Sequence, residues 1–317
     1  MSASEFRRLL EAAPTAAELE EVAARIGAAD LLHDFQVKMN CERVAMLEKY
    51  ARVLNQWLVL GGGFVINYYV LADIGEPPCF TFVLDAAPPR RGTKAQWIAK
   101  VPQINSELLR RGVATSAELG GRVVYFGTLE HDVEKDALPY LLPLRAPVVA
   151  RWSGVPLWRY LERLGIRLSY SDVVALKRLS REILGVDTPR VDYVRVGVSV
   201  ALEPPVEIYK GITVSSIRWQ LSEKAVHKVI RPLEEGRVDH DVLKAVLDLR
   251  AVWAAGPPDL GRSEAARLAE ALPQAAEVAA VYWNSHHYVL VRRKYQTPRE
   301  VAERISAFIR ESLADVG

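Results

Sequence analysis

Cysteine is almost missing from this chain of 317 residues, which contains only Cys41 and Cys79. Two thiols cannot form a metal-binding cluster by themselves, and a fold held together by several disulfides is excluded. Lone cysteines of this kind are most often reduced and packed among other side chains. A disulfide between them would require the two residues to meet in space.

The sequence also lacks any uninterrupted apolar run long enough to cross a bilayer, although 50% of its residues are hydrophobic. Its beginning, MSASEFRRLLEAAPTAAELEEVAARIG, carries Glu and Arg at helical spacing and has no apolar signal-peptide core. We therefore expect a cytoplasmic protein. The length allows more than one domain and a well-buried core.

Neither positive nor negative charge is in large excess, because the chain has 41 basic and 39 acidic residues and a net charge of +2. No overall field therefore requires a nucleic-acid partner, and only local patches can indicate one. Asn and Gln are scarce while Arg and Glu are abundant, a bias compatible with a thermophilic source. Fixed-period repeats and low-complexity tracts are absent, which argues against a solenoid.

Hydrophobic periodicity and turn residues divide the chain into four predicted parts: N-terminal helices over 1–56, a core over 57–150, a hairpin and helical region over 151–255 and a terminal unit over 256–317. In the first part we expect helices over 4–13, 15–27 and 31–56. A helix over 93–111 and a strand over 122–129 are expected in the core, followed by an irregular or extended segment from residue 138.

The second half of the chain is predicted to be largely helical. We expect helices over 156–185, a hairpin pairing residues 191–202 with 206–214, and helices from 215 to Pro232 and over 240–254. Gly256-Pro257-Pro258 then reads as a linker. Beyond it, a helix over 263–272, a hairpin over 279–294 and a helix over 298–314 would form a small α-β-β-α unit.

The most informative stretch is VLGGGFVINYYVLADIGEPPCFTFVLDA, residues 59–86. We expect a strand over 57–60, a turn at Gly61, Gly62 and Gly63, a helix over 64–72 and a strand over 80–85. Glycine has no Cβ, so such a turn can approach a phosphate group closely, or it can simply pack tightly against a neighbouring strand. Both interpretations remain open for the three glycines.

Asp85 ends the second predicted strand and is either a metal ligand or a residue that hydrogen-bonds the following turn. Two carboxylates spaced two residues apart on a strand can share a divalent metal ion, because they point to the same side. Here Val83 occupies the first of these positions. Glu130, just beyond the strand over 122–129, is the preferred candidate for a further metal-binding carboxylate.

Basic residues provide the other candidates. Arg90, Arg91 and Lys94 follow Asp85 and form either a phosphate-binding rim or a solvated loop. Lys224, Arg237, Asp239 and Asp241 either complete a site or form helix-surface ion pairs. In the terminal unit, Trp283, Tyr288, Arg292, Arg293 and Lys294 would bind RNA if they shared an exposed face, whereas a hairpin with a buried aromatic face would not.

The Leu60-Gly61-Gly62-Gly63 turn, the apolar helix and the Phe-Thr-x-x-Leu-Asp strand together resemble the AbiEii-type nucleotidyltransferases. These proteins are the toxin half of abortive-infection toxin–antitoxin pairs and belong to the polymerase-beta-like superfamily. Their pattern is a Gly-Gly-Ser/Thr turn followed by an Arg-x-Thr-x-Asp-x-Asp strand. The later segment LSEKAVHKVIRPLEEGRVDHDV is similar to the family's helix with a lysine and its basic-x-Asp-x-x-Asp signature.

On this resemblance Gly62 and Gly63 correspond to the turn, Thr81 to the threonine, Asp85 to the second aspartate and Lys224 to the helical lysine. It implies an α/β (α+β) fold with a nucleotidyltransferase-like mixed sheet, and catalytic roles for Asp85, Thr81 and Lys224. The implied activity is transfer of a nucleotidyl group from a nucleoside triphosphate to RNA or protein with Mg²⁺, with RNA or an antitoxin protein as partner. Because Val83 replaces the first aspartate, the alternative is a catalytically inactive binding or regulatory protein. A partner-binding protein unrelated to nucleotides is the third hypothesis.

Overall fold

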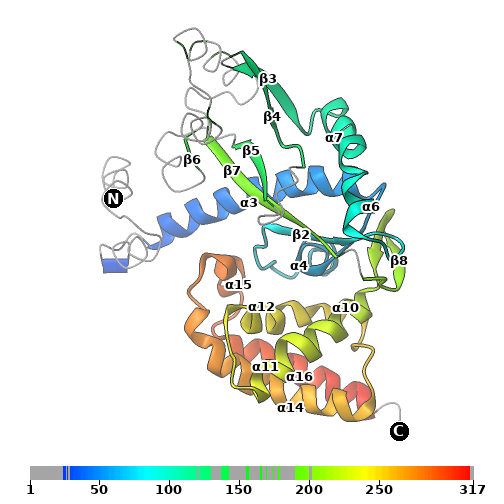
Figure 1. Cartoon of the computed structure of the whole chain (residues 1–317). Helices are drawn as coiled ribbons and strands as arrows, with labels where there is room; N and C mark the ends of the chain where they lie inside the picture. Colours follow the sequence, from blue (N-terminus) through cyan, green and yellow to red (C-terminus); the bar gives the residue numbers. More distant parts are fainter. Residues whose placement is uncertain are drawn as a thin grey trace. The chain divides into compact units, whose positions relative to one another are not determined.

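The computed structural model describes residues 24, 25, 27, 29–119, 121–129, 137–142, 155, 156, 165, 169, 174, 178, 190–199 and 202–314. The chain divides into two compact units (Figure 1). The first unit comprises Met1–Val53 and Ala95–Val196, and the second comprises Leu54–Lys94 and Gly197–Gly317. The four-part division made from the sequence stays a prediction.

The first unit contains most of the long helix α3 (Ala29–Leu54), which confirms the helix predicted over 31–56. Near the end of this helix Tyr50 is fully buried, and its hydroxyl donates a hydrogen bond to the carbonyl oxygen of Gly127 at 2.8 Å. The predicted helices over 4–13, 15–27 and 156–185 lie almost entirely outside the described residues.

The single helix predicted over 93–111 is wrong, because the structure has two helices, α6 (Lys94–Ile98) and α7 (Val101–Arg110). Pro102 lies in the first turn of α7, where its missing N–H costs no hydrogen bond, and this favours a new helix start. After α7, β3 (Thr115–Leu119) pairs antiparallel with β4 (Arg122–Phe126). Further on, β5 (Ala137–Leu142) and β6 (Val155–Pro156) each pair antiparallel with β7 (Arg190–Val198).

The second unit contains a mixed sheet, as the sequence predicted. Strand β1 (Val59–Gly61) pairs antiparallel with β2 (Val83–Ala87) and parallel with β9 (Ile212–Ser215), which pairs antiparallel with β8 (Val206–Tyr209). The predicted span of 80–85 for the second strand is wrong by three residues at its start and two at its end. Asp85 is therefore in the middle of β2, where it lies directly opposite Gly61.

The predicted hairpin between 191–202 and 206–214 is wrong. Residues 206–215 form a hairpin of their own, β8–β9, with its turn at Lys210 and Gly211. Both turn residues have positive φ, 52° and 78°. Two consecutive positive φ values are those of a type I′ turn, whose twist matches that of paired strands, so the local turn chemistry selects this pairing.

Three groups of helices follow the strands of this sheet in sequence. The first runs without a break through α4 (Gly62–Val65), the π-helix η1 (Ile66–Val70) and α5 (Leu71–Asp73). The second consists of α10 (Ile217–Lys224), the π-helix η3 (Ala225–Ile230) and α11 (Arg231–Glu234). The third consists of α12 (His240–Asp248), the 3-10 helix η4 (Leu249–Ala251) and α13 (Val252–Ala255), close to the helix predicted over 240–254.

The C-terminal helices pack on one another and on α12. Helix α14 (Arg262–Val278) contacts α12, η3 and α16 (Pro298–Ala314), and the orange α14 and red α16 run side by side in Figure 1. The predicted hairpin over 279–294 is wrong, because this segment forms the 3-10 helices η5 (Ala279–Tyr282) and η6 (His286–Tyr288) and the helix α15 (Val289–Arg292). Tertiary packing explains the difference, since Tyr288 is fully buried and the backbone N–H of Phe80 donates to His287 O at 2.8 Å. The terminal unit therefore has no β-β element over these described residues.

Within the part of the chain that the structure describes, no helix has both the length and the apolar character needed to span a membrane. Neither cysteine is part of a disulfide, and Cys41 is exposed whereas Cys79 is buried.

Candidate functional site

The glycine turn and Asp85 meet where β1 and β2 pair. Gly62 has φ +68°, and a Cβ at this position would lie 1.9 Å from Asp85 Oδ2, so no other residue fits without displacing the carboxylate. The backbone N–H of Gly63 donates a hydrogen bond to the Asp85 carboxylate. The turn therefore both holds Asp85 and leaves room for it.

Lys244 reaches this turn from α12. Its Nζ lies 3.0 Å from Thr81 Oγ1, and a Cβ on Gly63 would lie 3.1 Å from the same Nζ. Thr81 is buried just before β2. The structure thus brings Gly63, Thr81 and Asp85 together with a lysine that the sequence reasoning did not select.

Lys224, at the end of α10, pairs with a second residue that the sequence reasoning missed. Its Nζ lies 2.8 Å from Oδ2 of Asp248, a carboxylate with 0% exposure. Asn67 Nδ2 donates to Asp248 Oδ1 at 2.7 Å and to the Gly63 carbonyl oxygen at 2.8 Å. Asn67 therefore ties the Lys224–Asp248 pair to the glycine turn.

Opposite charges are balanced in this site, which contains two aspartates and two lysines. Asp85 is solvent-exposed as a residue, but the surrounding protein removes enough water from its carboxylate to raise its pKa. Lys224, Lys244 and the Gly63 N–H act in the opposite direction and lower this pKa. Burial opposes the charge of Lys224, but Asp248 and, to a smaller extent, Asp85 outweigh this effect and raise the pKa of Lys224. Both lysines are placed to attract an anionic group.

A sequence signal for the missed residues exists in α12. His240, Lys244 and Asp248 are spaced four residues apart, which places them along one stripe of the helix. Asp248 lies within the apolar run VLKAVLDL, and a charged residue inside such a run requires a partner when the helix is buried. This pattern could have identified Lys244 and Asp248 as site candidates.

Two of the three basic residues predicted to form a rim have described side chains. Arg90 and Arg91 are exposed, and Arg91 Nε lies 3.5 Å from Glu203 Oε2. Lys94 begins α6, and Glu130 lies outside the described residues.

The acidic residues predicted beside Lys224 have structural roles. Asp239 caps α12 by accepting from the N–H groups of Asp241 and Val242 at 2.9 and 3.2 Å. Asp241 pairs with Lys228 at 3.3 Å, and Arg237 pairs with Glu235. These interactions are the helix-surface alternative that the sequence left open.

The condition set for RNA binding by the terminal unit, one exposed face of aromatic and cationic residues, is not met. Tyr288 has 0% exposure, Arg292 donates to the Trp283 carbonyl oxygen at 3.0 Å, and Lys294 pairs with Glu76. Because Tyr288 is buried, the five residues do not share one exposed face and do not form the RNA-binding surface.

A protein-held pair of magnesium ions does not fit the described residues. They contain no group of three His, Cys, Asp or Glu side chains arranged to hold a metal ion. Val83 and Asp85 both point toward Gly197, since a Cβ there would lie 3.9 Å from Val83 Cγ1 and 3.5 Å from Asp85 Oδ1. Val83 therefore occupies the place where a second carboxylate would stand. The set fits one magnesium ion that enters with a nucleotide, because such ions commonly take one or two protein carboxylates and complete their shell with phosphates and water.

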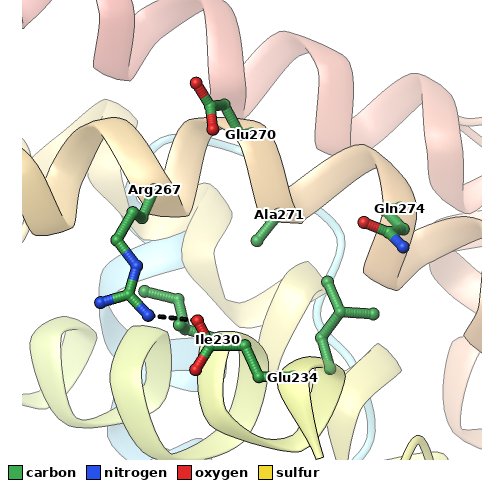
Figure 2. Close-up of a pocket in the computed structure, with 7 residues that line it drawn as sticks. Ile230, Glu234, Arg267, Glu270, Ala271 and Gln274 are labelled. Carbon is green, nitrogen blue, oxygen red and sulfur yellow. Dashed lines mark hydrogen bonds and ion pairs between the residues drawn. The ribbon is translucent and has the colours of Figure 1, made fainter. Parts of the chain in front are cut away.

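A separate surface pocket lies over α14, with one wall from η3 and α11. Figure 2 shows Arg267 reaching across it to the Glu234 carboxylate. The predicted site residues do not line this pocket, and an exposed ion pair contributes little chemistry. We therefore place the candidate site at the glycine turn.

Comparisons with known proteins give one structural likeness. No family model matches the sequence, and no curated protein matches it. The fold is similar to a crystal structure from H. pylori that is provisionally assigned as a nucleotidyltransferase, with 10% sequence identity and a TM-score of 0.40, over 87% of this chain and 96% of that chain. A TM-score of this size carries no argument about chemistry, so the AbiEii type, a toxin–antitoxin pairing and a thermophilic source stay predictions.

Proposed function

We propose that this protein binds a nucleoside triphosphate at the Gly62–Gly63 turn and transfers its nucleotidyl group to RNA or to a protein. The observation that carries the proposal is the convergence of Lys224, Lys244 and Asp85 on a turn that has no room for side chains. Two lysines beside the half-buried Gly62 suit a polyphosphate, because cations favour anions.

Each residue has a role in this proposal. Lys244 binds the phosphates, and Thr81 keeps the Lys244 ammonium group in place through its 3.0 Å contact. Lys224, held by Asp248, balances the negative charge that develops as the acceptor oxygen bonds to the α-phosphorus and pyrophosphate leaves.

Asp85 is the carboxylate available to a magnesium ion that enters with the nucleotide. When bound, such an ion neutralises phosphate charge. The raised pKa of Asp85 reflects the water that the surrounding protein removes from its carboxylate, a cost that a nearby cation reduces.

A second candidate function, nucleotide binding without transfer, is favoured by one specific observation. Val83 stands on the Asp85 side of β2, where a second metal-binding carboxylate would be expected. In this case the site would recognise a nucleotide as a regulatory signal.

Calorimetry with the four Mg-nucleoside triphosphates, together with transfer of an α-phosphate label, tests both candidates. We expect Lys244→Ala to weaken binding about tenfold or more, because a charged hydrogen bond is worth about 1.5–3 kcal/mol. Asp85→Ala should retain binding but lower transfer about 100-fold. Lys228→Ala, which removes an exposed lysine paired with Asp241, is the control and should change neither.

The outcomes separate the candidates. Wild-type protein that binds nucleotide without transferring label supports the binding function, and Val83→Asp should then increase magnesium affinity while the exposed-site control Val206→Asp should not. Full transfer by Asp85→Ala would exclude the role of Asp85. Absence of binding at millimolar nucleotide would reject both candidates.

A further inference from the structure

The polar stripe of α12 continues past the lysine of the proposed phosphate site to His240. His240 stands four residues, about one helical turn, before Lys244, a rise of about 6 Å along the axis. His240 also belongs to a group of neighbouring rings, which we call the ring cluster: Phe82, His240, His286 and His287.

The ring cluster joins three segments that are distant in sequence. The His287 ring centroid lies 5.3 Å from that of Phe82, 5.0 Å from that of His240 and 4.2 Å from that of His286. Phe82 and His286 are nearly parallel, with an interplanar angle of 11° and a centroid distance of 6.3 Å. All four residues are half-buried, so part of each residue remains accessible to solvent.

Two hydrogen bonds fasten this cluster to the segment that carries Thr81. The Phe80 N–H donates to His287 O at 2.8 Å, and His287 Nδ1 lies 2.7 Å from Phe80 O. Thr81, the partner of Lys244, stands between Phe80 and Phe82. The ring cluster is therefore connected to the proposed phosphate site in two ways. Phe82 directly follows Thr81 in the segment that enters β2, and His240 precedes Lys244 on α12.

We propose that the ring cluster is the nucleobase subsite of the nucleotide site, with Phe82, His286 and His287 as the stacking surface. The inference rests on the proposed function, since a base lies one ribose beyond the α-phosphate and the cluster lies one helical turn beyond Lys244. Stacking on aromatic faces accepts every base, because every base has a π-face. The cluster therefore supplies affinity for nucleosides in general, without selecting one base.

The state of His240 agrees with this role. Burial, together with Lys244, lowers the pKa of His240, while Asp241 and Asp239 act in the opposite direction. Its Nε2 lies 3.0 Å from the Tyr288 hydroxyl. A neutral imidazole beside Lys244 adds no competing cation to the phosphate end of the site.

Comparison of two ligands separates the base from the phosphates. We would titrate wild-type protein with ATP and with inorganic triphosphate by calorimetry, and repeat both titrations with Phe82→Leu, His286→Ala and Lys244→Ala. The matched control is Phe308→Leu, a half-buried phenylalanine on α16. Thermal unfolding of each variant identifies any that is not folded, and the two ring variants serve as replicates of one another.

We expect Phe82→Leu and His286→Ala to weaken ATP binding at least about fivefold and to leave inorganic triphosphate binding unchanged. Lys244→Ala should weaken both ligands, and Phe308→Leu neither. Ring variants that bind ATP like wild type, or that lose both ligands equally, would overturn the nucleobase subsite and leave the proposed function standing. Wild-type protein that binds neither ligand would reject the proposed function and, with it, this inference.

Discussion

Gly62 is the residue on which the proposed site depends most directly. Its φ of +68° is a backbone conformation that residues with a Cβ rarely adopt, and a Cβ there would also overlap the Asp85 carboxylate. The first effect is purely conformational, whereas the second concerns the site. Gly75 has the same φ of +68°, but among the described residues no neighbouring atom lies within 4 Å of the position that a Cβ would take, so it isolates the first effect.

We expect Gly62→Ala to lower the free energy of unfolding by about 2–5 kcal/mol, combining about 1–2 kcal/mol of backbone strain with about 1–3 kcal/mol of overpacking. Gly75→Ala should lower it by about 1–2 kcal/mol, from strain alone. Urea denaturation of both variants checks this. Equal losses in the two variants would mean that Asp85 does not lie against Gly62.

At the scale of elements, α12 carries the polar stripe that links the phosphate site to the ring cluster. The position of this helix depends on its N-cap, Asp239, whose Oδ1 accepts from two backbone N–H groups that would otherwise lack a helical partner. Asp241, two residues later, makes only an exposed pair with Lys228. The two aspartates therefore differ in what they contribute, although both lie in the same acidic segment.

We expect Asp239→Ala to reduce the free energy of unfolding by about 1 kcal/mol, the usual effect of losing an N-cap. Asp241→Ala should cost about half of this or less, since it loses an exposed ion pair and a dipole interaction. Thermal unfolding of the two variants at one pH gives the comparison. A larger loss in Asp241→Ala would contradict the capping role of Asp239.

At the scale of the whole molecule, a buried charge network joins three distant parts of the second unit. Glu76, after α5, lies 3.3 Å from Nη1 of the fully buried Arg250, and the Tyr295 hydroxyl lies 3.1 and 2.9 Å from the two Glu76 oxygens. Lys294 completes the network. The segment before β2, the helix after α12 and the entry to α16 are thereby held together.

We expect Glu76→Gln to lower the free energy of unfolding by about 3 kcal/mol, because Arg250 is then buried without a carboxylate. Glu303→Gln is the control, since it changes an exposed pair with Arg299 and should cost about 0.5 kcal/mol or less. Guanidinium denaturation measures both. If Glu76→Gln were as mild as the control, the network would not hold these parts together.

The sequence by itself determined the local features of this protein. The order of strand, glycine turn, helix and strand around Gly62 and Asp85, the long helix ending at Leu54 and the terminal helix over 298–314 were all predicted, because turn chemistry and apolar periodicity act between residues that are close in the chain. The sequence also shows directly that position 83 carries valine and not a carboxylate.

Only the tertiary structure decided which distant residues join this turn. Lys244 meets Thr81 across 163 residues, and Asp248 meets Asn67 across 181, contacts that no local pattern specifies. The segment over 279–294, for which the sequence predicted a hairpin, is helical and packs on residues around Phe80 and on α12. Local chemistry therefore determined the glycine turn and the position of Asp85. Long-range packing brought the lysines and the ring cluster to this turn, because the surroundings of a side chain depend on elements that are distant in the sequence.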